Sequence, residues 1–223
     1  MQSKLKIYIA DDHNIVRKGM ARLLKTFSRV EEVQESANGK ELIQLIKKQQ
    51  PDAVILDIEM PEMNGFDTAE YLIGNYPDIK ILVLTMHTED VFISRLMDMG
   101  VHGFLSKSSE PEEVELALYS IIDKDFYRSE LVNDAILHMK IPTPKPSLEK
   151  LSHREIEILT LICQEQTPDE ISKRLNISRK TFFNHRSHIM VKAGVRNSIG
   201  LYRYALQHGF IVNKISGQDA THQ

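Results

Sequence analysis

Short apolar runs alternate with longer stretches of helical period along the first half of the chain. The runs AVIL at residues 53–56 and ILVL at 81–84 are typical of strands buried on both faces. Between such runs, apolar residues recur at near-helical spacing, as do Ile15, Gly19 and Leu23. The pattern predicts strands at residues 6–10, 32–36, 53–57, 80–84 and 103–105, with helices at 14–26, 39–49, 66–75, 89–99 and 111–123. It indicates an α/β domain whose parallel sheet is covered by helices on both faces.

The second half of the chain has a different pattern. A short helix is predicted within residues 126–139, and the following segment KIPTPKPSLEK holds three prolines, which cannot sustain a helix or a central strand. Beyond this linker the pattern is helical throughout, with helices expected at 153–164, 168–175, 179–193 and 198–208. The chain therefore divides into domains at residues 1–124 and 148–215, joined by a linker at 125–147 and followed by a flexible tail at 216–223.

Capping signals fix where the later helices begin. Ser152 and Thr167 are each followed three residues on by Glu, which predicts a capping box at each position. Only a two-residue turn, 176–177, separates the second of these helices from the third, as in a helix-turn-helix that reads DNA. In the third helix the core stripe is expected to contain Phe182, Arg186, Ile189 and Ala193, whereas Lys180, Asn184, Ser187 and Val191 point outward. An ordinary solvated helix face is the alternative explanation of that polar side.

Charge adds an asymmetry between the halves. The net charge is only −3, but residues 1–128 hold 15 Lys and Arg against 22 Asp and Glu, a balance of −7, and residues 147–215 hold 11 against 6, a balance of +5. The basic half is the better candidate for contact with a polyanion, although ordinary scatter between domains would also explain the difference. The single cysteine, the lack of a signal-peptide core and apolar runs too short to span a bilayer favour a cytoplasmic protein with no membrane partner.

Candidate chemistry gathers at one edge of the predicted sheet. Asp11 and Asp12 follow the first strand, Asp57 ends the third, and Thr85 and Lys107 follow the fourth and fifth. Ligands bind at this carboxyl edge in open α/β sheets. Clustered carboxylates are typical ligands of Mg²⁺. A carboxylate can also attack phosphorus to give an acyl phosphate. The negative charge on the phosphoryl oxygens is then stabilised by a nearby cation and a hydroxyl donor. Each residue alone has an ordinary structural explanation, but together at one edge they favour phosphoryl chemistry.

The segments IADDH, LDIEMPEMNGFD, VLTMH and GFLSK resemble the signature segments of bacterial response-regulator receiver domains, over roughly residues 4–123. The resemblance implies a flavodoxin-like fold with a parallel sheet in the order 2-1-3-4-5. It implies that Asp57 is the phosphoacceptor, that Lys107 and Thr85 bind the phosphoryl oxygens, and that Thr85 and Phe104 form the conformational switch. It also implies Mg²⁺ as the cofactor, held by Asp11, Asp12, Asp57 and the backbone carbonyl of Glu59.

Residues 148–211 closely resemble the LuxR-type helix-turn-helix of the NarL/FixJ subfamily of response regulators, which implies a small all-α domain. The resemblance implies DNA contacts by Ser178, Lys180, Thr181, Phe183, Asn184, Arg186 and His188. It further implies dimerisation through the fourth helix of this domain, around Leu201, Tyr202 and Ala205.

Two of the departures from the LuxR-type pattern lead to specific expectations. Phe183 stands where a basic residue is common, so one cationic contact is expected to be missing and an aromatic could touch a thymine methyl or pack on the receiver. Glu165 stands where Gly is usual, and a left-handed backbone there would cost on the order of 1 kcal/mol.

Together these features predict a two-component response regulator and transcription factor. A sensor histidine kinase would phosphorylate Asp57 with Mg²⁺, which would favour a homodimer that binds double-stranded DNA. On this reading the protein is not an enzyme beyond its own phosphorylation and dephosphorylation. The alternatives are a scaffold that binds DNA or proteins without phosphorylation and a Mg²⁺-dependent phosphohydrolase.

Overall fold

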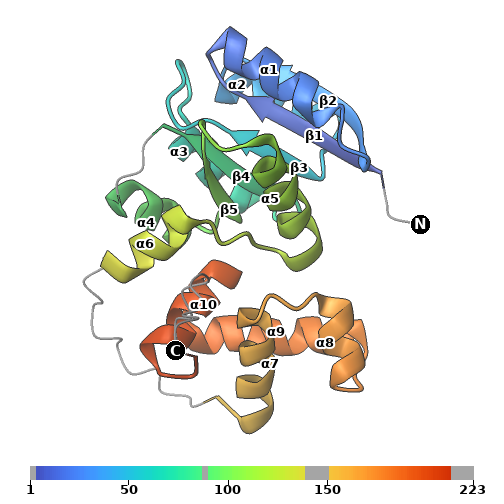
Figure 1. Cartoon of the computed structure of the whole chain (residues 1–223), viewed down its shortest axis with the longest axis vertical. Helices are drawn as coiled ribbons and strands as arrows, with labels where there is room; N and C mark the ends of the chain where they lie inside the picture. The colour runs from blue at the N-terminus through green and yellow to red at the C-terminus, as the bar shows by residue number, and fades with distance from the viewer. Residues whose placement is uncertain (1–3, 87–89, 139–150, 212–223) are drawn as a thin grey trace, which may run out of the picture.

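The computed structural model describes residues 4–86, 90–138 and 151–211, which form an α/β lobe and a smaller helical lobe (Figure 1). The proline-rich part of the predicted linker and the predicted tail at 216–223 lie outside the described residues. The α/β lobe comes first in the chain, and the helical lobe packs against one end of it.

One parallel sheet forms the centre of the first lobe. Its strands are β1 (Leu5–Ala10), β2 (Val30–Ser36), β3 (Ala53–Leu56), β4 (Lys80–Thr85) and β5 (Gly103–Ser106). They lie in the order β2-β1-β3-β4-β5, and every neighbouring pair is parallel. The order predicted from the resemblance is therefore confirmed, and the carboxyl ends of β1, β3, β4 and β5 share one edge.

Side-chain alternation along the strands divides the core of this lobe into two layers. Ile7 and Ile9 face one side of the sheet, while Tyr8 and Ala10 face the other. The first layer is covered by α1 (Asn14–Leu24) and α5 (Pro111–Lys124). The second is covered by α2 (Gly39–Lys48), α3 (Gly65–Asn75), α4 (Asp90–Met99) and α6 (Glu130–His138). Because both faces are covered, β3 is apolar along its whole length, and β4 is apolar from Ile81 to Leu84.

The second lobe consists of α7 (His153–Cys163), α8 (Pro168–Arg174), α9 (Arg179–Ala193) and α10 (Ser198–Gln207). Both predicted capping boxes are present, since Ser152 and Glu155 bond reciprocally, as do Thr167 and Glu170. Gly194 ends α9 in the left-handed conformation with φ 66°. The predicted helix-turn-helix is therefore formed by α8 and α9.

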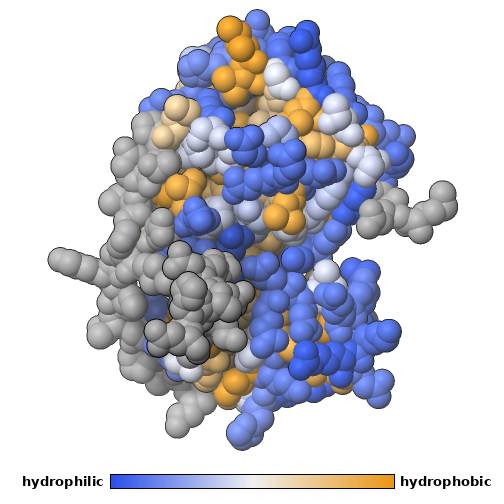
Figure 2. Space-filling model, in the orientation of Figure 1, coloured by the Kyte–Doolittle hydropathy of each residue, from blue (hydrophilic) through white to orange (hydrophobic). Residues whose placement is uncertain are grey.

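The boundary between the two lobes has an apolar interior and, on one face, a hydrophilic edge. Buried apolar side chains form a continuous cluster from the α4 side of the sheet into α7, α9 and α10. On the face drawn in Figure 2, hydrophilic residues line the boundary between the lobes. Within the part of the chain that the structure describes, no helix is both long and apolar enough to cross a membrane.

Candidate functional site

The predicted acidic rim is assembled at the carboxyl edge of the sheet. Asp57 follows β3 directly, and its backbone N–H donates to the carbonyl of Ala10 in β1 at 2.8 Å. This pairing brings Asp57 beside Asp11, and both carboxylates are buried, with 3% and 2% of their surface exposed. Asp12 is more open, with 35% of its side chain exposed. The rim therefore has a buried floor and one carboxylate that reaches solvent.

Lys107 connects the two buried carboxylates. Its Nζ donates to Oδ2 of Asp57 at 2.7 Å and lies 2.9 Å from Oδ2 of Asp11. The Lys107 backbone N–H is held by the carbonyl of Thr85 at 2.9 Å, so the ends of β4 and β5 fix where this side chain starts. The other oxygen of Asp57, Oδ1, accepts the backbone N–H of Ile58 at 2.8 Å. Asp57 is thus oriented by one cation and one backbone donor.

Burial and charge act together on this pair. Burial raises the pKa of Asp57, and the ion pair with Lys107 offsets that rise only in part. Burial alone would lower the pKa of Lys107, but its hydrogen bond with Asp57 and the nearby negative charge of Asp11 hold that pKa above its usual range. A protonated lysine is therefore kept next to Asp57, which is the arrangement that stabilises negative charge added to that carboxylate.

The acidic residues suit a divalent cation. Oxygen or nitrogen atoms of Asp11, Asp12, His13 and Asp57 all lie within 4.8 Å of one another. Oδ2 of Asp11 is buried, and no donor in the described part of the chain gives it a well-formed hydrogen bond, although Lys107 lies close by. Two buried carboxylates and one open carboxylate match the oxygen-rich, partly hydrated site that Mg²⁺ prefers. His13, which the sequence interpretation did not single out, lies 2.7 Å from Asp12 through Nδ1.

The loop after β3 approaches the rim closely. Gly65 is the first residue of α3, and a Cβ placed there would lie 2.2 Å from the carbonyl oxygen of Asp57. A glycine is therefore required for the backbone to pass this close to the site. Glu59, whose carbonyl was predicted to bind metal, is in this loop with an exposed side chain. The predicted switch residues Thr85 and Phe104 are buried, at 1% and 0% exposure.

A second group of predicted residues lies along α9. Phe182 and Ile189 are buried in the core, as the helical spacing predicted. On the opposite side an exposed stripe runs along the helix, which we call the reading face: Lys180, Phe183, Asn184, Ser187, His188 and Val191.

Phe183 is 42% exposed but well supported. Its ring packs edge-on against the buried ring of Phe182 at 5.2 Å, and the Arg179 guanidinium lies 6.0 Å from it. At the start of α9, the Ser178 hydroxyl accepts the N–H of Thr181 and their two hydroxyls lie 2.8 Å apart. The helix therefore presents polar groups and one rigid aromatic ring to solvent.

Both domains of the chain match known protein families. Residues 7–133 match the family described as "Response regulator receiver domain", and residues 149–205 match "Bacterial regulatory proteins, luxR family". The chain belongs to the response-regulator family. This response regulator has a receiver domain followed by a LuxR-type DNA-binding domain, as the resemblance predicted.

Relatives of the same architecture span nearly the whole chain. The response regulator UvrY of Escherichia coli K12 is 30% identical over 207 residues, which cover 92% of this chain and 95% of UvrY. The oxygen regulatory protein NreC of Staphylococcus aureus is 32% identical over 211 residues, covering 91% and 97%. A solved complex of the response regulator RcsB with DNA is 29% identical and superimposes with a TM-score of 0.58, over 92% of this chain and 99% of RcsB.

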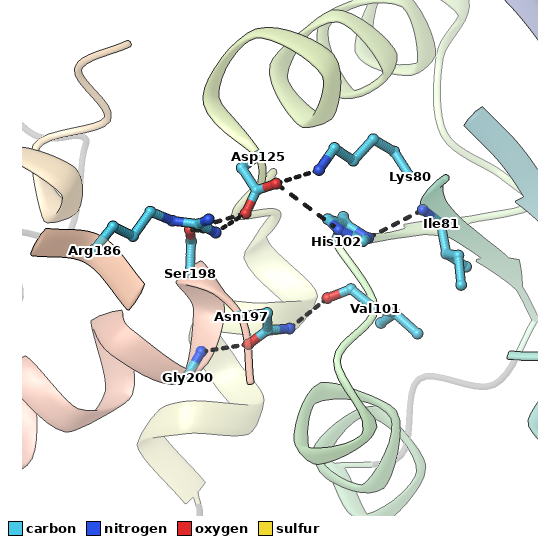
Figure 3. A network of polar contacts seen from close by, with 9 residues as sticks. All are labelled: Lys80, Ile81, Val101, His102, Asp125, Arg186, Asn197, Ser198 and Gly200. Atoms are coloured by element: carbon cyan, nitrogen blue, oxygen red, sulfur yellow. Dashed lines mark hydrogen bonds and ion pairs between the residues drawn. The ribbon is translucent and has the colours of Figure 1, made fainter. Parts of the chain in front are cut away.

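The polar contacts that join the two domains of the response regulator were not predicted from its sequence (Figure 3). Asp125, just after α5, forms an ion pair with Arg186 of α9, and Arg186 also donates to the Ser198 hydroxyl at 3.0 Å. Lys80 pairs with the same carboxylate from the receiver side. Asp125 has φ 75°, in the left-handed region that few residues other than Gly, Asn and Asp adopt, and neither this conformation nor its ion-pair partners can be predicted from the local sequence.

Buried His102 lies beside this carboxylate. Its Nδ1 accepts the backbone N–H of Ile81 at 3.1 Å, and its Nε2 lies 3.9 Å from Asp125. Burial lowers the pKa of His102 to about 4, so the ring is neutral near pH 7. Burial alone would raise the pKa of Asp125, but the cations of Arg186 and Lys80 hold that pKa below its usual range. The carboxylate therefore stays ionised at the domain boundary.

Proposed function

We propose that Asp57 accepts a phosphoryl group with Mg²⁺ and that this modification controls dimerisation and DNA binding by the second domain. The observation that carries the proposal is the position of Lys107, whose Nζ lies 2.7 Å from the buried carboxylate of Asp57 and 2.9 Å from that of Asp11. A histidine kinase is the expected donor, because response regulators as a family are partners of such kinases.

In the proposed step, a carboxylate oxygen of Asp57 attacks phosphorus. The bond from phosphorus to the donor nitrogen breaks, and its electron pair leaves with that nitrogen. Lys107 is already charged and its side chain is only 8% exposed, so it can bind a phosphoryl oxygen with little reorganisation. Thr85, which ends β4, is the proposed hydroxyl donor to another phosphoryl oxygen.

Mg²⁺ would be held by Asp11, Asp12, Asp57 and the backbone carbonyl of Glu59. When bound, it offsets the repulsion between carboxylates and the negative charge of the phosphoryl group. The burial and close approach of the rim carboxylates support this assignment. Thr85 and buried Phe104, on neighbouring strands, are proposed to change position together after phosphorylation and to alter the receiver surface around α4 and β5.

The reading face of α9 is proposed to enter the major groove of double-stranded DNA. Lys180, Asn184 and His188 can reach phosphates or base edges, and Ser178, Thr181 and Arg186 are proposed phosphate contacts. Phe183 cannot replace a cation, so we propose that it packs against a thymine methyl. Its support on Phe182 favours this role, because a ring that is already ordered loses little conformational freedom on binding.

Labelling with acetyl phosphate and Mg²⁺ tests the receiver half of the proposal. Intact-mass measurement is expected to show one added phosphoryl group on the wild-type chain and none on Asp57→Asn, a nearly isosteric change that removes the nucleophile. Lys107→Arg provides a control that retains a positive charge at the site.

Two results would overturn this function. Labelling that persists in Asp57→Asn would place the reaction elsewhere. Rapid turnover of many phosphate esters per chain without accumulation of the labelled form would indicate a phosphohydrolase.

A further inference from the structure

A cavity lies between α4 of the receiver and the segment that leads from α9 into α10. Its volume is about 500 Å³, which is within the range of sites that bind small molecules. Asn197, one of the lining residues, holds the two sides together, because its Nδ2 donates to the carbonyl of Val101 at 2.6 Å (Figure 3). The proposed phosphorylation and DNA contacts do not involve this cavity.

Three arginines line the cavity from three parts of the chain. Arg95 is on α4, Arg196 is in the loop between α9 and α10, and Arg203 is on α10. Asp98 is the carboxylate among the described lining residues, and it pairs with Arg203 at 2.6 Å. Three guanidinium groups with one carboxylate leave an excess of two positive charges around the cavity.

Arg95 and Arg196 supply that excess. The Arg95 guanidinium lies 4.8 Å from the centre of the Phe66 ring, a contact that orders the cation without neutralising it. Arg196 lies against the receiver, since a Cβ placed at Gly100 would be 3.7 Å from its own Cβ. Among the side chains that the structure describes, no carboxylate forms an ion pair with either arginine.

Cations near the carboxyl end of a helix can also serve to stabilise its dipole. The last turn of α4 contains no basic residue, so Arg95 lies outside the region where this effect is strong. The last turn of α9 already contains Lys192. The helix ends therefore do not account for the group of arginines.

The rotation of α10 brings Arg203 to the cavity. Leu201, Tyr202 and Ala205, which the LuxR-type resemblance assigned to dimerisation, are 0%, 4% and 0% exposed. Because these residues belong to the core, Arg203 lies on another side of the helix, where its side chain is 22% exposed.

Apolar side chains form another part of the lining. Met97 is 3% exposed, and Met99 and Val195 are partly buried. Methionine side chains adapt their shape, and their sulfur atoms make favourable contacts with aromatic rings. A Cβ placed at Gly194 would meet no atom within 4 Å, so there is space at this edge of the cavity. The cavity therefore combines cations with an apolar surface.

From this combination we propose that the cavity binds a small organic phosphate of the size of a nucleoside monophosphate. A guanidinium group matches two phosphate oxygens, and the excess of two positive charges balances the charge of about −2 on a phosphate monoester. Arg95 and Arg196 bind the phosphate, and Met97, Met99 and Val195 contact the planar base. Because arginines neutralise the phosphate, this site needs no metal ion and is independent of the acidic rim.

Isothermal titration calorimetry on the full-length chain, with EDTA present, tests this inference. The probes are AMP, GMP, CMP and UMP, with each nucleoside and inorganic phosphate as the two parts of the ligand. We expect at least one monophosphate to bind at one site per chain. Its nucleoside and inorganic phosphate should each bind at least ten-fold more weakly, because each makes only part of the contacts. A Kd above about 1 mM for all four monophosphates would overturn the inference.

Substitutions at exposed arginines test which cation binds the phosphate. Arg196→Gln should raise the Kd of the bound monophosphate about ten-fold or more, because a hydrogen bond to a charged group is lost. Arg196→Lys keeps the charge but not the paired donors, so its Kd should lie between those of wild type and Arg196→Gln. The matched control is Arg22→Gln on α1, which should leave the Kd within about two-fold of wild type.

Methionine methyl NMR tests where the ligand lies. With ¹³C-labelled methyl groups, the signals of Met97 and Met99, assigned from Met97→Leu and Met99→Leu, should shift when the monophosphate binds. The signal of Met20 on α1 should not shift.

Three further results would overturn the inference. Inorganic phosphate that binds as tightly as every monophosphate would show that the apolar surface contributes nothing. Affinity that falls in Lys180→Gln, on the reading face, but not in Arg196→Gln would place the nucleotide on the DNA-contacting helix. Unchanged Met97 and Met99 signals at saturation would exclude the cavity. None of these results bears on phosphorylation of Asp57, which is measured separately with Mg²⁺.

Discussion

Asp125 offers the sharpest test of how the two domains are held together. Its carboxylate pairs with Arg186 from the DNA-binding domain and Lys80 from the receiver, and the three side chains are 18–22% exposed. Asp125→Asn keeps the shape of the side chain and tolerates the left-handed backbone at φ 75°. The substitution removes the charge and leaves the two cations facing a neutral amide.

The free-energy cost expected for Asp125→Asn follows from the partial burial of these three side chains. Removing one partner of a fully buried ion pair costs about 3–5 kcal/mol, and partial exposure here reduces that to about 2 kcal/mol. Because Arg186 belongs to one domain and Lys80 to the other, we expect much of this loss to appear in the contact between domains. A change of about 2 kcal/mol shifts the ratio of closed to open chains by roughly 30-fold.

Single-molecule energy transfer between dyes on exposed Lys18→Cys and Lys173→Cys, in a Cys163→Ser background, would report this ratio. The matched control is Asp123→Asn, two residues earlier, which breaks a bidentate pair with Arg29 inside the receiver. We expect Asp125→Asn to increase the open population and Asp123→Asn to leave it unchanged while lowering receiver stability. An unchanged open population in Asp125→Asn, or an equal increase in both variants, would refute this account of the interface.

Three further predictions concern His102, Glu165 and Phe183. The pKa of His102 is about 4 in the folded chain and ordinarily 6.5, so the unfolded chain binds more protons between these two pH values. The unfolding free energy of wild type, measured by urea titration, should therefore rise by up to about 3 kcal/mol from pH 4 to pH 6.5. His102→Asn should flatten this rise. Glu165→Gly should relieve about 1 kcal/mol of backbone strain at φ 60°. Its melting temperature should be higher than that of Glu165→Gln, because both variants lose the ion pairs with Lys124 and Arg128 and only glycine removes the strain. Equal melting temperatures would contradict the strain. Phe183→Lys should make the slope of log affinity for DNA against log salt concentration steeper by about 1, because it adds one phosphate contact. Phe183→Ala should abolish the preference for thymine over uracil at one position of a DNA site selected in vitro. An unchanged preference would exclude the methyl contact.

Much of the fold was accessible from the sequence because its signals are local. The runs at residues 53–56 and 81–84 are strands buried on both faces, and Ser152 and Thr167 form the expected capping boxes. Glu165 was recognised as an unusual residue at a left-handed position, and its φ of 60° agrees with that expectation. Each of these features depends on residues within a few positions of one another.

The contacts between domains could not be predicted in the same way. Arg186 was assigned both to the core stripe and to a phosphate contact; it is half-buried and pairs with Asp125, 61 residues away in the chain. Asn197 reaches Val101 across 96 residues, and no periodicity or cap signals such a pair. The proposed roles of the rim residues come from the resemblance to a family, whereas the position of α10 against α4 depends on tertiary packing that no local pattern encodes.

Phosphorylation of Asp57 is proposed to raise the affinity for DNA that carries two half-sites, one for each DNA-binding domain of a dimer. The deciding measurement is a DNA titration of wild type and Asp57→Asn with and without acetyl phosphate and Mg²⁺, with intact mass recorded on the same samples. We predict that wild type gains one phosphoryl group and binds a DNA duplex with both half-sites, selected in vitro, at least ten-fold more tightly. Asp57→Asn should gain no phosphoryl group, and its DNA affinity should not change. A stoichiometrically phosphorylated wild-type chain whose DNA affinity is unchanged would contradict the account.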